Sequence, residues 1–237
     1  MINYFSYLKH PKPINSYEPS LSFKEKSIIF LNTTLITFGL AIVAAIISVL
    51  FDKFLVLTFS IKSLANFQVS NFDHAVKNFG KYKLICVAVI VPAIEELIFR
   101  LPLRKKSSFI AYSIAMLLYP LFGFSYFHFN FWSLEFYLFA GLFFVLLPFC
   151  LYRFFVWINL EAILKRNYKI YFYFMATLFA FVHIANFKPL NYHLIFLYPI
   201  YVLPQFVMGV SLGYLRNKCG IKYSWLLHGL INLPHGF

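Results

Sequence analysis

The chain has 237 residues, of which 61% are hydrophobic, 22% aromatic and 12% charged, and its mean hydropathy is +0.74. Soluble domains carry about a quarter charged residues, so this balance argues against an ordinary soluble fold. The net charge is +13, but the basic residues stand in short clusters between apolar runs, which argues against the one-sided footprint of a nucleic-acid-binding protein. We therefore expect an integral protein of the lipid bilayer, with no nucleic-acid partner.

The first 83 residues divide into three stretches that differ in polarity and charge. Residues 1–27 are polar and lysine-bearing, without the early apolar core of a cleaved signal peptide, and we expect them to stay in the cytoplasm. Residues 28–50 carry no charge and predict the first membrane helix. Residues 51–83 mix lysines and aspartates with the apolar run 54–61. That run is too short to cross, which favours an interfacial or re-entrant piece or a hidden pair of crossings.

Further apolar spans follow along the rest of the chain. They cover 84–103, 109–127, 134–152, 171–187 and 194–215, with a short last segment from 223 to the end. The loops after alternate spans are rich in lysine and arginine, which predicts a cytoplasmic N-terminus and an opposite C-terminus, in a bacterial cytoplasmic membrane. Gly209 and Gly213 are spaced for close helix contact.

These spans predict one all-α, polytopic transmembrane bundle. Its short loops and lack of internal repeats suggest a single bundle over 28–237, after the segment 1–27. We expect about seven to eight membrane helices, each needing about 20 apolar residues.

Two glutamates and an arginine interrupt the second span, at Glu95, Glu96 and Arg100. Charges at membrane depth cost several kcal/mol unless they are paired or face a polar cavity. Residues four apart share a helix face, so Glu96 and Arg100 are predicted to form an internal ion pair. Glu95 points elsewhere and needs a partner from another helix.

Two later segments offer such partners. His183 follows Phe179 by four residues, and His228 and Asn232 share one helical face. A buried glutamate with a histidine can deprotonate water. A second imidazole and a carboxamide can donate hydrogen bonds to the oxyanion that forms. Together these groups predict amide hydrolysis in an intramembrane cavity.

The three motifs, in this order on separate apolar spans, resemble those of the CAAX protease and bacteriocin-processing (CPBP, or Abi) intramembrane endopeptidases. The functional paradigm of that family is the Ras-converting CAAX endopeptidase. The resemblance runs from 92 to 232 and implies a protease core over 84–233. It also implies a hydrolase that cleaves a peptide bond of a membrane-anchored peptide or protein.

The resemblance further implies residue roles. Glu95 and His183 would activate the attacking water, and His228 and Asn232 would stabilise the oxyanion. Three residues would support the site: Glu96, Arg100 and Phe179.

Metal dependence is a separate question. Some descriptions of the family call its members metalloproteases, and Glu95, His183 and His228 would suit zinc with water in the fourth position. The chain lacks the H-E-x-x-H pair that most strongly indicates zinc. We therefore favour a mechanism without a cofactor and keep zinc as the alternative.

Two functions of other classes compete with proteolysis. In a proton-coupled transporter, Glu95 and the histidines would relay protons, but such carriers often show repeated halves that this chain lacks. In a scaffold or immunity factor the same residues would be idle. The sequence leaves the natural substrate, and whether it is prenylated, open.

Overall fold

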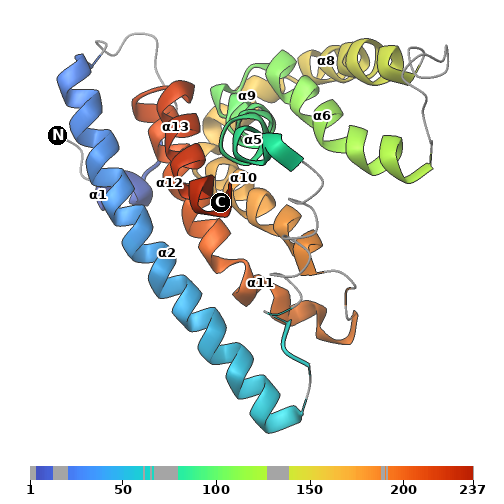
Figure 1. Cartoon of the computed structure of the whole chain (residues 1–237). Coiled ribbons are helices and arrows are strands. Elements are labelled where there is room, and N and C mark those ends of the chain that lie inside the picture. The colour runs from blue at the N-terminus through green and yellow to red at the C-terminus, as the bar shows by residue number, and fades with distance from the viewer. Residues whose placement is uncertain are drawn as a thin grey trace.

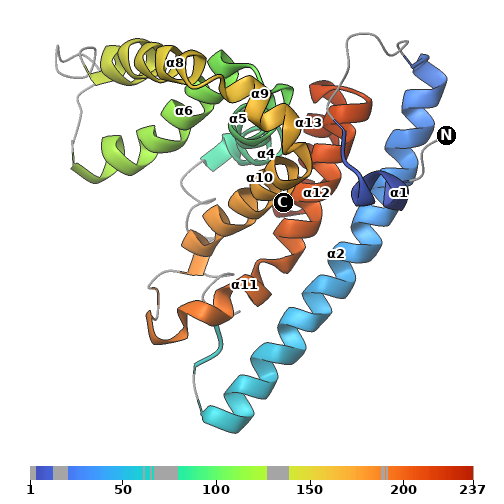
Figure 2. The same cartoon turned by 180° about the vertical axis from the view of Figure 1, so that it is seen from behind.

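The structure is a computed structural model that describes residues 4–12, 21–60, 62–64, 66, 80–126, 139–187, 190 and 192–236. It is all-α, as predicted. The long helix α2 (Phe23–Phe59) runs along one side, and α6 (Ser107–Tyr126) packs with α8 (Leu147–Trp157) on the far side (Figures 1 and 2). The helices that carry the predicted site residues lie between them.

Helix α2 is one continuous helix of 37 residues. A capping box formed by Ser22 and Glu25 starts it, and Ser60 ends it in the left-handed conformation. Its length of about 55 Å exceeds the roughly 30 Å hydrocarbon core. Residues 54–59 of the run 54–61 continue α2 without a break, so they form no helix of their own, and the interfacial position of this end of α2 stays a prediction.

The aspartate in the second half of α2 does not interrupt it either. Asp52 is buried, and its Oδ1 accepts hydrogen bonds from Tyr201 Oη at 2.8 Å and from the Leu64 N–H at 3.0 Å. Its Oδ2 accepts one from Ser63 Oγ at 2.6 Å. A satisfied carboxylate is tolerated inside the bundle. The crossings considered between 51 and 83 fall largely on 67–79, outside the described residues.

The predicted span 84–103 is a chain of short helical pieces. Its parts are a 3-10 turn (Gly80–Tyr82), α4 (Lys83–Ile85), a π-helical turn (Cys86–Ile90), α5 (Val91–Phe99) and a 3-10 turn (Leu101–Arg104). Pro92 directly follows the π-helical turn in one continuous helical run, so its missing N–H leaves a carbonyl of that turn without its intrahelical partner. Another π-helical turn, Leu142–Leu146, precedes α8, and α9 spans Leu160–Arg166.

The C-terminal half contains the most buried helix, α12 (Leu203–Lys218). Around it lie α1 (Tyr4–Lys9), α10 (Tyr168–Val182), α11 (Tyr198–Tyr201) and α13 (Ile221–Asn232). Three 3-10 turns complete this half: His183–Phe187, Tyr192–Leu197 and Leu233–Gly236.

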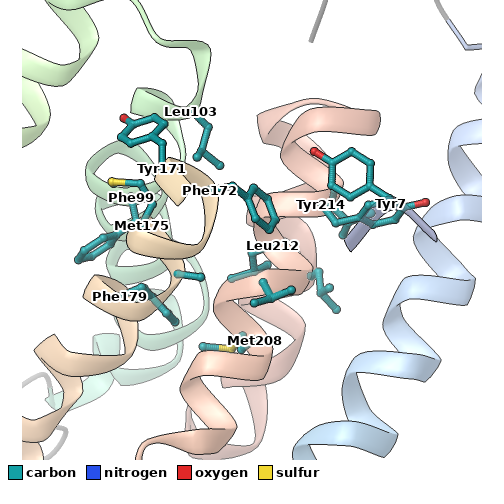
Figure 3. Packing of buried hydrophobic residues seen from close by; sticks show 14 of the residues in the cluster. Tyr7, Phe99, Leu103, Tyr171, Phe172, Met175, Phe179, Met208, Leu212 and Tyr214 are labelled. Atoms are coloured by element: carbon teal, nitrogen blue, oxygen red, sulfur yellow. The ribbon is translucent and has the colours of Figure 1, made fainter. Parts of the chain in front are cut away.

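The main core extends across α10 and α12, with Phe172 between these two helices and Tyr7 and Tyr214 on the other side of α12 (Figure 3). A Cβ on Gly213 would lie 2.8 Å from Phe172 Cε2, and one on Gly209 would lie 3.0 Å from the carbonyl oxygen of Ala176. The predicted close helix contact at these two glycines is confirmed. Tyr7 of α1 packs against the same core.

The described residues contain three helices that are long and apolar enough to cross a membrane: Phe23–Phe59, Phe139–Trp157 and Tyr168–Phe187. A fourth span is possible if the pair His193–Tyr201 and Leu203–Lys218, bent by 48°, counts as one. Candidate spans of this kind mark an integral membrane protein. The larger predicted number is not shown, because the second predicted span is divided into short pieces and α13 has only 12 residues.

Candidate active site

The imidazole of His228 lies between the two adjacent glutamates of α5. Its Nδ1 is 3.1 Å from Glu96 Oε1, in a hydrogen bond, and its Nε2 is 3.3 Å from Glu95 Oε2. His228 is fully buried, whereas the Glu95 side chain is 24% exposed. Since an ionised carboxylate only accepts hydrogen bonds, the first contact places a proton on Nδ1. The ring is thereby held with Nε2 directed at Glu95.

Glu96 is the more enclosed of the two carboxylates. Its Oε2 accepts a hydrogen bond from Ser224 Oγ, and its Oε1 lies 3.5 Å from Arg100 Nε. The predicted ion pair with Arg100 is therefore confirmed, although 3.5 Å is longer than an ordinary N–H···O hydrogen bond. Arg100 is the residue after α5, with φ of −111°, and this altered backbone changes the direction of its side chain. Glu96 therefore also forms hydrogen bonds with His228 and Ser224, in addition to its expected pair with Arg100.

The arginine is stabilised by an aromatic face as well. Arg100 Cζ lies 4.0 Å from the centroid of the Phe179 ring, in a cation–π arrangement, and both side chains are buried. The same ring lies 4.8 Å from the ring of His183 and 5.7 Å from that of His228. Phe179 therefore contacts the arginine and both predicted histidines.

His183 ends α10 and turns back onto it. Its Nδ1 lies 2.8 Å from the carbonyl oxygen of Phe179. A carbonyl only accepts, so Nδ1 donates, and in the neutral ring the lone pair is on Nε2. His183 also interacts electrostatically with Glu95, Arg100 and His228. Among the described residues, however, no hydrogen bond joins it to Glu95.

Asn232, which was expected to stabilise the oxyanion, forms a hydrogen bond with the backbone in the structure. Its Nδ2 donates to the carbonyl oxygen of Val87, 3.4 Å away in the π-helical turn. Trp225 Nε1 likewise donates to Val89, at 3.0 Å. Because π-helical hydrogen bonding departs from the α-helical ladder, carbonyls in such a turn are available to a neighbouring helix. The structure brings Glu95, His183 and His228 together with the supporting residues, and ties Asn232 to the adjacent turn.

Ser224 was missed by the sequence reasoning. It precedes His228 by four residues, so it stands on the same face of α13 as His228 and Asn232. This spacing was a usable signal. A serine is common in membrane helices, and only the contact with Glu96 distinguishes it.

The zinc alternative can be compared with this arrangement. Within the described part of the chain, no group of three or more His, Cys, Asp or Glu side chains could hold a metal ion. His228 Nε2 and Glu95 Oε2, 3.3 Å apart, lie at the separation of two ligands of one zinc ion, but the described residues bring no third such side chain to them. This pair is one protein ligand short of the three that hold a catalytic zinc, so no step below uses zinc.

Comparison with known families supports the predicted resemblance. Residues 150–234 match the family model described as Rce1-like, type II CAAX prenyl endopeptidase. No curated protein and no solved structure matches the chain. The matched residues include His183, His228 and Asn232, whereas Glu95 and Glu96 precede them.

Proposed function

We propose, from the premise that residues 150–234 form an Rce1-like domain of the CPBP protease family, that this membrane protein is an intramembrane endopeptidase. It would hydrolyse a peptide bond of a membrane-anchored peptide or protein. The observation that supports this best is the pairing of Glu95 Oε2 with His228 Nε2 at 3.3 Å. Both atoms are buried, and no other group among the described residues hydrogen-bonds to either of them.

Glu95 is the proposed base, and it activates the attacking water together with His183. The Glu95 carboxylate takes a proton from water, and the hydroxide forms a bond to the carbonyl carbon of the substrate. The carbonyl π electrons move to the oxygen, which becomes the oxyanion. The oxyanion electrons then re-form the C=O bond as the C–N bond breaks, and the leaving nitrogen takes the proton held by Glu95, so that an amine and a carboxylic acid are released. The partial exposure of Glu95, beside a fully buried His228, is consistent with access for water.

The oxyanion is assigned to His228 and Asn232. In its doubly protonated form, His228 keeps Nδ1–H on Glu96, and its Nε2–H, which faces Glu95 Oε2 in the free protein, donates to the oxyanion once Glu95 has taken the proton from water. The carboxamide of Asn232 carries two N–H donors, of which the contact with Val87 uses one. Glu96, Arg100 and Ser224 hold the imidazole in place. The proposed protease core, 84–233, contains all of these residues.

The proposed setting is the bacterial cytoplasmic membrane, with the N-terminus in the cytoplasm. The basic loops between the apolar spans support this orientation.

The proposal is tested with the purified protein in lipid nanodiscs and a panel of membrane-anchored peptides. Wild type should cleave at least one peptide, and Glu95→Gln and His183→Ala should both lose cleavage. Glu161→Gln is the matched control, because that exposed carboxylate on α9 accepts from the Ser107 N–H instead. Equal cleavage by wild type and both site variants would overturn the assignment, and so would a wild type that cleaves none of the peptides.

A further inference from the structure

Two consecutive polar residues are buried near the end of α12. Arg216 is 2% exposed and Asn217 is 8% exposed. A buried guanidinium or carboxamide is costly unless its hydrogen bonds are satisfied. The partners of these two side chains therefore indicate what they hold.

Arg216 holds the end of the helix that carries both glutamates. Its Nε donates to the carbonyl oxygen of Arg100 at 3.2 Å. The Leu103 N–H donates to the same oxygen, also at 3.2 Å. The last carbonyls of a helix lack partners within the helix, and a cation at that end is favourable. Arg216 thus fixes the point where α5 passes into the 3-10 turn.

Asn217 reaches the same turn through a tyrosine. Its Nδ2 donates to Tyr168 Oη and to Tyr7 Oη, both at 2.7 Å. Tyr168 Oη donates in turn to the carbonyl oxygen of Leu103, at 3.3 Å. Tyr7 Oη donates to the carbonyl oxygen of Lys12, at 2.9 Å. Only the Tyr168 branch touches the turn after α5, and the Tyr7 branch secures the N-terminal segment.

The chain also connects these residues to the other side of the site. α12 passes through Cys219 and Gly220 directly into α13, which carries His228. One helix therefore holds α5 by side-chain hydrogen bonds and positions α13 by covalent connection. The contacts of His228 with Glu95 and Glu96, at 3.3 and 3.1 Å, join these two sides.

We propose that Arg216 and Asn217 are positioning residues, which hold the turn Arg100–Leu103 so that α5 presents its two carboxylates to His228. The effect on catalysis rests on the proposed function. A displacement of about 1 Å at a catalytic group can lower the rate about a hundredfold. The two residues themselves touch none of the reacting groups.

The experiment uses four variants in nanodiscs. Arg216→Gln and Tyr168→Phe each remove a bond to the turn. Arg216→Lys keeps a cation that can donate to the Arg100 carbonyl. Tyr7→Phe is the matched control, because it removes the other hydroxyl bonded to Asn217 and leaves the turn untouched.

Two readouts are taken from each variant. Hydrogen–deuterium exchange should speed up in the amides of residues 100–105 for Arg216→Gln and Tyr168→Phe, and stay as in wild type for Tyr7→Phe. For the same two variants kcat should fall about tenfold to a hundredfold with KM unchanged, because misplaced groups lose transition-state stabilisation. Arg216→Lys should recover part of both readouts.

The results separate the two proposals. Unchanged exchange in Arg216→Gln and Tyr168→Phe, or equal change in Tyr7→Phe, would overturn the positioning role. If the wild-type protein shows no proteolysis, the proposed function is wrong. Hydrogen–deuterium exchange alone then decides whether Arg216 and Asn217 hold the turn. Faster hydrogen–deuterium exchange with an unchanged kcat would show that Arg216 and Asn217 hold the turn without affecting catalysis, and would reject the positioning role in catalysis.

Discussion

Gly229 of α13 lies directly against Ala88 of the π-helical turn: a Cβ on Gly229 would clash with the Ala88 carbonyl oxygen. The neighbouring bonds from Trp225 and Asn232 go to Val89 and Val87. Three consecutive carbonyls of the turn therefore contact one face of α13. This contact sets how far His228 lies from the glutamates that follow the turn.

Gly229→Ala should push α13 away from the turn and lower both stability and cleavage. The contacting atom is backbone and cannot move aside, so we expect a loss of about 1–3 kcal/mol in unfolding free energy. Thermal unfolding in nanodiscs and peptide cleavage measure the two effects. Gly39→Ala is the matched control, because a Cβ there meets nothing within 4 Å. A Gly229→Ala protein as stable and active as Gly39→Ala would contradict the close contact.

Changing each of the two adjacent glutamates to glutamine should have a different effect. Glu95→Gln should retain the fold and lose at least about a hundredfold in kcat, since it removes the proposed base. Glu96→Gln should instead destabilise the fold by about 3 kcal/mol, because it leaves the buried Arg100 without its countercharge. Urea unfolding measures the stability of each variant, and single-turnover cleavage measures its catalytic rate. The opposite pattern would exchange the roles proposed for the two carboxylates.

Phe179→Ala should be much more damaging than Phe181→Ala. Phe179 is fully buried beneath Arg100 and both histidines, so its truncation should cost about 3–5 kcal/mol and disturb the site. Phe181 is 47% exposed and should tolerate the same change. Thermal unfolding of the two variants side by side provides the measurement. Similar losses in both would contradict the packing role of Phe179.

Chelator treatment addresses the zinc alternative. We expect cleavage by the purified wild type to be unchanged after incubation with a chelator, because the described residues do not gather the three side-chain ligands of a catalytic zinc site. Activity is measured before and after, together with the metal content of the protein. Loss of cleavage that zinc restores would contradict the metal-independent mechanism.

The thiol of Cys219 should resist alkylation in the folded protein. Burial raises its pKa to about 11, and the reactive thiolate is therefore scarce at neutral pH. Mass spectrometry after iodoacetamide treatment should find Cys219 unmodified at pH 7 to 8 and modified after denaturation. The raised pKa also means that Cys219 favours folding below its unfolded pKa, and that this contribution fades as pH rises toward 11. Rapid modification at neutral pH would contradict the buried thiol.

The sequence by itself determined the membrane character, the all-α class and the candidate residues, because composition and spacing along one helix are local properties. The Glu96–Arg100 pair was predictable for that reason, since both members lie on one turn of one segment. The motif order also pointed to the protease family that residues 150–234 match.

Only the tertiary structure decided how the helices face one another. Spacing places Ser224, His228 and Asn232 on one side of α13, but it does not fix the rotation of that helix against α5. That rotation directs His228 to both glutamates, Ser224 to Glu96 and Asn232 to Val87. The burial of Asp52 within α2 likewise depends on the distant Tyr201, which donates a hydrogen bond to its carboxylate. These arrangements depend on contacts between segments far apart in sequence, and no local sequence pattern predicts such contacts.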